Sequence, residues 1–184
     1  MPARAKVYQI KVTLDGSKPP IWRRIQVRSD VTLEKFHYIL QTVMGWTNSH
    51  LHQFIVGGIS FGEPYPDYGD TMQDERRMRL NQITASEGFK FKYEYDFGDS
   101  WMHTLLVEKV LEPQPGQQYP VCIKGKGACP PEDVGGVWGY YNFLEALRDP
   151  NHPEHEMYME WIGGEFDPQE FDLEETNGML RGVR

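Results

Sequence analysis

The chain has 184 residues, of which 39% are apolar and 25% are charged, and its formal net charge is −8. This composition supports a hydrophobic core without disulfides and excludes a disordered chain, which lacks apolar content. No apolar run approaches the roughly 20 residues that span a bilayer. The first six residues contain no apolar signal core, so we expect a cytoplasmic protein with no membrane partner.

The first third of the sequence predicts a hairpin followed by a helix. Apolar and polar residues alternate over residues 8–14 and 21–28, which is the period of half-buried strands, and turn residues separate the two runs. Asp30 or Thr32 can cap the next helix, because a short side-chain oxygen reaches free backbone N–H groups. Apolar residues then recur at helical spacing until Gly45, which predicts the end of the helix.

A second hairpin is expected after this helix. The runs 50–56 and 59–61 are joined by two glycines, which suit a turn that needs positive φ. His50 and His52 share one face of the first run, and we assign them to packing or to a rim. Residues 62–78 are rich in Pro, Gly and charge, which predicts a long loop, and a short helical turn follows at 80–83.

The clearest strand signal lies at residues 89–97, where five aromatic residues alternate with charged ones. We predict that the aromatic row is part of the core. A Gly-Asp-Ser turn at 98–100 leads into another strand at 101–111. The row consists of Phe89, Phe91, Tyr93, Tyr95 and Phe97.

The last third has a different character. Residues 112–136 are rich in Pro and Gly, which predicts an irregular segment, and three short helices follow. We place the first at 138–148 and the second between Asn151 and Gly163. The third is expected to begin at Asp167, because a capping residue, a proline and a glutamate stand in the order of a helix start.

Strands early and helices late predict an α+β fold. We expect one domain over residues 1–184, with strand hairpins and one helix forming a mainly antiparallel sheet in the N-terminal two-thirds. Short helices would lie at the C-terminal end.

Three motifs together resemble the plasmid pRiA ORF-three-like family, whose members occur on bacterial and archaeal plasmids and transposons. They are Trp22-Arg23-Arg24, the run from Tyr95 to His103, and the run from Ala128 to Gly136. The resemblance covers nearly the whole chain and implies an association with mobile elements. The resolvase label that some members carry finds no matching catalytic serine or tyrosine constellation in this sequence.

Polar side chains gather at two of these motifs and form the candidate binding cleft. Two carboxylates and an imidazole could hold a divalent metal, while the alternative is that the aspartates cap turn amides. In the second motif, the acidic pair could share a proton or a cation, or could satisfy the start of the following helix. The candidate residues are Asp96, Asp99, Trp101, His103, Glu132 and Asp133.

The two cysteines, Cys122 and Cys129, are separated by six residues, which matches neither a redox motif nor the usual zinc spacing. We expect buried or idle thiols, with a reversible disulfide or metal ligation as alternatives. No cofactor is predicted, although a divalent metal stays open.

The charge is uneven, with 8 basic and 3 acidic side chains in residues 1–47 but 2 basic and 10 acidic in residues 149–184. The leading hypothesis is a non-catalytic domain that binds a protein or a small ligand. One alternative is a metal-assisted hydrolase that uses the acidic residues and histidine of the cleft. The other is a DNA-associated accessory protein acting through Trp22, Arg23, Arg24 and Arg28, which the acidic total disfavours.

Overall fold

The protein is described here by a computed structural model over residues 4–65, 71–84 and 86–183, and in these ranges the strands form one eight-stranded sheet. The strand order is β5-β4-β3-β6-β7-β1-β2-β8, and neighbours are antiparallel except for the parallel pair of β4 and β5. The strands are β1 (Val7–Leu14), β2 (Trp22–Arg28), β3 (His52–Val56), β4 (Ile59–Gly62), β5 (Gln73–Asp74), β6 (Lys90–Tyr95), β7 (Trp101–Leu111) and β8 (Val121–Lys126).

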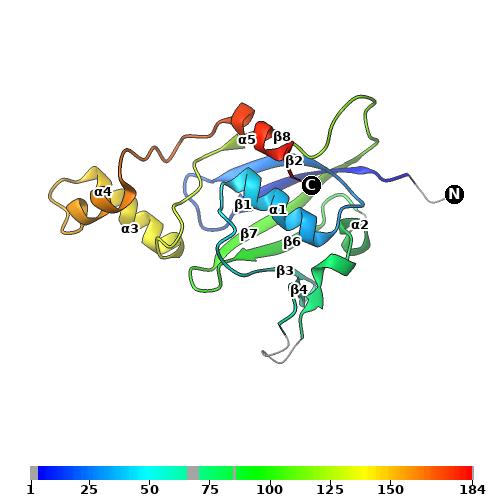
Figure 1. Ribbon diagram of the computed structural model, residues 1–184, viewed down its shortest axis with the longest axis horizontal. Helices are drawn as coiled ribbons and strands as arrows, with labels where there is room; N and C mark the ends of the chain where they lie inside the picture. Colours follow the sequence, from blue (N-terminus) through cyan, green and yellow to red (C-terminus); the bar gives the residue numbers. More distant parts are fainter. Residues whose placement is uncertain (1–3, 66–70, 85, 184) are drawn as a thin grey trace.

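The four longer helices in the described ranges fall into two groups by their position relative to the sheet (Figure 1). Helix α1 lies across the sheet and α5 lies near β8, whereas α3 and α4 project beyond one end of the sheet (Figure 1). The short elements η2 and α2 lie in the connection between β5 and β6. The helices are α1 (Leu33–Met44), the 3-10 turn η2 (Glu75–Arg77), α2 (Leu80–Ile83), α3 (Gly136–Arg148), α4 (His155–Ile162) and α5 (Leu173–Leu180).

The core lies between α1 and one face of the sheet. Phe36 of α1 stacks on Phe54 of β3 at 5.7 Å between ring centroids, and Phe91 and Tyr93 of β6 lie beside them. These side chains are buried, since the alternation of each strand directs every second residue to this face. Polar side chains of neighbouring strands form ion pairs, such as that between Arg24 and Glu108 at 2.7 Å.

A buried arginine links three elements at the edge of this core. Arg23 of β2 donates to the carbonyl oxygens of Val43 and Met44 at the end of α1, at 2.7 and 3.4 Å. It also donates to the carbonyls of Lys126 and Gly127 at the end of β8, at 3.0 and 2.8 Å. The last carbonyls of a helix have no partner within the helix, so this side chain satisfies groups that burial would otherwise leave unpaired.

Most of the expected elements are present. Two early hairpins agree with the prediction, and so does the helix that Thr32 caps and Gly45 ends. The helical turn at 80–83 and the strand at 101–111 are also present. The α+β class with a mainly antiparallel sheet is confirmed. Within the described ranges, every helix is too short or too polar to cross a lipid bilayer.

Four local predictions were wrong. The irregular segment 112–136 contains β8, and the predicted loop 62–78 contains β5 and η2 among its described residues, while 66–70 lie outside them. The third C-terminal helix begins at Leu173 with Asp172 as its cap, because Asp167 instead caps a turn by accepting from Gln169 N–H. Phe97 is 43% exposed, since the strand ends at Tyr95 and the aromatic row stops there.

Candidate functional site

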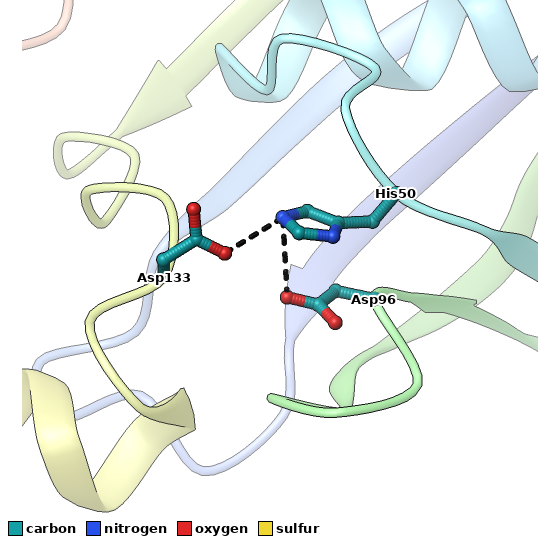
Figure 2. Close-up of side chains that lie close together, drawn as sticks. All are labelled: His50, Asp96 and Asp133. Atoms are coloured by element: carbon teal, nitrogen blue, oxygen red, sulfur yellow. Dashed lines mark ion pairs between the residues drawn. The ribbon is translucent and has the colours of Figure 1, made fainter.

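Three loops bring an imidazole and two carboxylates together. His50 lies in the loop between α1 and β3, Asp96 follows β6, and Asp133 lies in the loop before α3 (Figure 2). The His50 Nε2 atom is 2.7 Å from Asp133 Oδ1 and 3.6 Å from Asp96 Oδ2. One ligand atom from each residue can be chosen so that all three lie within 4.8 Å of one another. This cluster is the centre of the candidate site.

A third acidic side chain, Glu132, lies close to the cluster. Glu132 Oε2 is 3.8 Å from His50 Nε2. Its other oxygen, Oε1, accepts hydrogen bonds from Thr47 N–H at 2.9 Å and from the Tyr95 hydroxyl at 3.0 Å. Oε2 is buried and has no hydrogen-bond partner among the described residues. The carboxylate is therefore held by one oxygen while the other faces the imidazole.

Asp96 divides its oxygens in the same way. Its Oδ1 accepts from the backbone N–H groups of Gly98 and Asp99, at 3.0 and 3.3 Å, so the expected capping of turn amides is present. Its Oδ2 is the atom that faces His50. Capping of turn amides and binding of a ligand are not exclusive for Asp96, because each function can use a different oxygen of the carboxylate.

The backbone that carries these groups is unusual. Asp96 and Asp133 have φ values of 61° and 62°, and Asn48 and Ser100, in the same loops, have φ values of 54°. Asn and Asp adopt the left-handed region more readily than most residues, and such conformations recur where a side chain must point in a set direction. At Asp96 the conformation ends strand β6 and turns the carboxylate toward the loop that holds His50.

The β6–β7 turn and the loop before α3 are in direct contact, as predicted. Gly135 N–H donates to Asp99 Oδ2 at 3.0 Å. A Cβ atom at Gly136 would lie 2.5 Å from the Asp99 carbonyl oxygen, so this approach requires glycine. Asp99 therefore joins the two segments, while Asp96, Glu132 and Asp133 face His50.

Two of the predicted cleft residues lie elsewhere. Trp101 and His103 are fully buried, because both alternate onto the core face of β7. His103 Nε2 accepts from Trp46 Nε1–H at 3.2 Å, and its Nδ1 lies 3.2 Å from the Tyr93 carbonyl oxygen, so Nδ1 carries the proton. Burial lowers the pKa of His103 to about 4. It is a neutral core residue, and a site that includes it is wrong.

The histidine of the cluster is His50, which the sequence analysis assigned to packing or a rim. The strand β3 begins only at His52, so the two histidines do not share a strand face. A usable signal was present, since His50 is followed by Leu51 and preceded by Thr47-Asn48-Ser49, a polar loop after a helix.

Both cysteines are unpaired. Burial raises the pKa of the Cys122 and Cys129 thiols, so they stay protonated and are poor metal ligands. Neither belongs to the ligand cluster found among the described residues.

The basic residues of the DNA alternative are engaged within the protein. Arg23 is buried, Arg24 pairs with Glu108 at 2.7 Å, and Arg28 pairs with Asp30 at 3.1 Å. Arg24 also lies over the Trp22 ring, 5.0 Å from its centroid. Phosphate contacts would have to break these pairs, so the arrangement disfavours a nucleic-acid surface here.

A cavity of about 510 Å³ adjoins the cluster and shares His50 with it. Its wall includes a stacked pair, His37 and His52, with ring centroids 3.4 Å apart. His52 Nε2 lies 2.7 Å from Glu75 Oε2, and burial lowers the pKa of His37 to about 3. Two neutral rings, or one neutral ring and one protonated ring, can stack in this way, whereas two imidazolium ions would repel each other. Phe97, exposed at the end of the aromatic row, lines the same cavity.

The separations in the cluster approach those of a metal site. Ligand atoms about 2.1 Å from a tetrahedral zinc ion lie roughly 3.4 Å from one another. The distances from His50 Nε2 to Asp96 and Glu132, 3.6 and 3.8 Å, are close to this value. Asp133 stands too near at 2.7 Å, but its side chain is 66% exposed and free to retreat by the required fraction of an ångström. The donor set of one nitrogen and several carboxylate oxygens suits zinc, manganese or iron(II).

The fold and the site define an α+β domain with a histidine–carboxylate cluster where three loops meet at one side of an antiparallel sheet. The chain belongs to the plasmid pRiA4b ORF-3-like protein family, whose sequence model matches residues 6–175.

Two relatives support this assignment. The chain is 45% identical over 160 residues to the uncharacterized protein y4hQ of Sinorhizobium fredii, covering 86% of this chain and 82% of that protein. It is also similar to the crystal structure of MM3350, a protein of unknown function from Methanosarcina mazei Go1. In that case the TM-score is 0.85 at 40% identity, with 93% of this chain and 97% of the other covered.

Proposed function

We propose that this protein is a binding domain that holds a divalent cation between His50, Asp96 and Asp133. The observation that carries the proposal is the state of His50 Nε2, which is buried and faces carboxylate oxygens from two loops. It makes no well-aligned hydrogen bond with the described residues. A cation between these atoms would neutralise the crowded acids and be coordinated by the imidazole nitrogen.

The orientation of the acids supports the same function. Asp96 and Glu132 each use one oxygen for backbone or hydroxyl donors and keep the other directed at His50. Ligating carboxylates in metal sites are commonly held in this manner by outer hydrogen bonds. Asp133 is the exposed member, so the side of the site next to it is where water or a ligand atom would complete the coordination.

The adjoining cavity is the natural place for a small molecule bound together with the cation. Its volume of about 510 Å³ is within the usual range for ligand pockets. Its wall carries the acids Glu34, Glu63 and Glu75, and its one arginine, Arg76, already pairs with Asp74 at 2.9 Å. A ligand with a basic group suits this lining. Catalysis is not part of the proposal, since the hydrolase alternative relied in part on His103.

Calorimetric titration of chelator-treated protein with Mn²⁺ and with Zn²⁺ tests the proposal. We expect one cation per chain for at least one of the two metals, and more than about tenfold weaker binding, or 1.4 kcal/mol, in Asp96→Asn and His50→Gln. The substitution Glu160→Gln, on an exposed position of α4, removes the same charge outside the site and serves as the control. Equal binding by wild type and the triple variant H50Q/D96N/D133N would reject the site.

A further inference from the structure

A second cavity, of about 430 Å³, lies between the β1–β2 turn, the end of β8 and helix α3. It shares no residue with the cluster around His50 or with the cavity beside it. The Tyr141 hydroxyl donates to the Gly16 carbonyl oxygen at 2.8 Å and thereby holds α3 against the turn. Ala128 N–H donates to the Pro168 carbonyl oxygen at 3.0 Å and closes the side next to β8. The walls are therefore tied together by the fold.

The lining of this cavity includes proline, tyrosine and leucine side chains. Pro19 and Pro20 of the turn lie on one side, while Tyr140, Tyr141 and Leu144 of α3 lie on the other. Proline and tyrosine rings offer extended faces with little rotational freedom, which favours a planar apolar ligand. Aromatic rings gain from stacking against such faces beyond the area they bury.

The charges at the cavity have the opposite sign to the protein as a whole. Of the described residues that line it, Lys18, Lys126 and Arg148 are basic and only Glu145 is acidic. None of the three basic side chains forms an ion pair within the described ranges. In a chain with a net charge of −8, unpaired basic groups gathered at one cavity favour an anionic ligand.

We infer that this cavity binds a small aromatic carboxylate, with its ring between the prolines and α3 and its carboxylate near Arg148 and Lys126. One negative group and one flat apolar body account for both features of the lining. The site is independent of the proposed cation site, because the two are built from different residues.

Calorimetric titration with naphthalene-2-carboxylate tests the inference, with 2-naphthalenemethanol as the uncharged analogue. We expect one carboxylate bound per chain, at least about tenfold more tightly than the alcohol, which corresponds to 1.4 kcal/mol. The double variant K126Q/R148Q should lose this preference. The control Lys109→Gln removes an exposed charge of β7 outside the cavity and should bind like wild type.

Three results would overturn the inference. They are an absence of saturable binding up to millimolar carboxylate, equal binding of acid and alcohol, and an unchanged affinity in the double variant. Circular dichroism of each variant establishes that it is folded before titration. Because Asp96→Asn should leave this binding intact, the outcome does not depend on the cation site.

Discussion

Replacement of Arg23 by methionine should destabilise the protein strongly, although Arg23 itself lines neither of the two cavities. All five N–H groups of its guanidinium are used, and each bond ends on a backbone carbonyl oxygen. Phe171 covers the group, 4.0 Å from ring centroid to guanidinium carbon. Burial lowers the pKa of Arg23 to about 10, so it is still charged at neutral pH, and the carbonyl dipoles take the place of a carboxylate.

The magnitude follows from the carbonyls left behind. Methionine fills a similar volume but donates nothing, and each buried carbonyl that loses its donor costs about 1–3 kcal/mol. Some of these oxygens will find water after relaxation, so we expect a loss of about 3–5 kcal/mol, the usual cost of breaking a buried polar network. Arg23→Lys should cost less, because the ammonium keeps the charge and three donors.

Urea unfolding followed by tryptophan fluorescence measures these changes. Arg28→Met is the matched control, since this arginine lies on the same strand, is exposed, and forms one ion pair with Asp30. The control should change the free energy of unfolding by less than about 1 kcal/mol. If Arg23→Met behaves like the control, the carbonyls are satisfied without the guanidinium and the reasoning fails.

Three further predictions concern the core, the site and pH. Phe91→Ala should lower the free energy of unfolding by about 3–5 kcal/mol, whereas Phe97→Ala should lower it by less than about 1 kcal/mol, because the Phe91 ring is buried and the Phe97 ring is exposed. Equal losses in chemical denaturation would contradict the observed end of the strand. Gly136→Ala should weaken cation binding, because a Cβ atom there would push the loop away from the neighbouring turn. Gly163→Ala is the control, since Gly163 has a similar positive φ but no atom within 4 Å, and it should leave the affinity measured by calorimetry unchanged. Equal affinities of the two variants would show that the loop contact does not support the cation site. His103 has a folded pKa of about 4, which is below its unfolded value, so its contribution to stability is complete above about pH 6.5 and is lost as pH falls toward 4. Between these values, His103→Gln should reduce the pH slope of the free energy of unfolding by up to about 1.4 kcal/mol per pH unit. Equal pH slopes in the variant and the wild type, measured by denaturation at several pH values, would refute this.

The elements that local patterns define were predictable, and those that depend on distant partners were not. The hairpins and the first helix follow from alternation, turn glycines and a cap, all of which act over a few residues. Strand β8 is different, because its sequence contains Val121, Ile123 and Gly125 among lysines and pairs only because β2 presents a free edge. Gly125 is required there by the Phe171 ring, which a Cβ atom would meet at 2.6 Å.

The site was half predictable for a related reason. The carboxylates of Asp96, Glu132 and Asp133 lie in motifs of turn residues, where aspartate side chains are oriented by hydrogen bonds to nearby backbone amides. The choice of histidine depended on which face of each strand is buried at its ends. The positive φ at Asp96 ends β6 at Tyr95, before Phe97 is reached. β7 begins with Trp101 facing the core, so His103, two residues later, also faces inward. His50 lies before its strand, where alternation gives no information.

The place of β1 in the sheet has a consequence for the order in which the protein can form during synthesis. β1 is made first, yet it lies between β2 and β7, with Val7 opposite Leu111. Its second edge must therefore wait until more than half of the chain has left the ribosome, at a pace of about 5–20 residues per second. Asp133 emerges later still, so the nascent chain acquires its ligand cluster only after the central strands can close, and pairings this distant in sequence are slow steps in folding. Until then, the hairpin of β1 and β2 leaves the backbone N–H and C=O groups along its outer edges without strand partners.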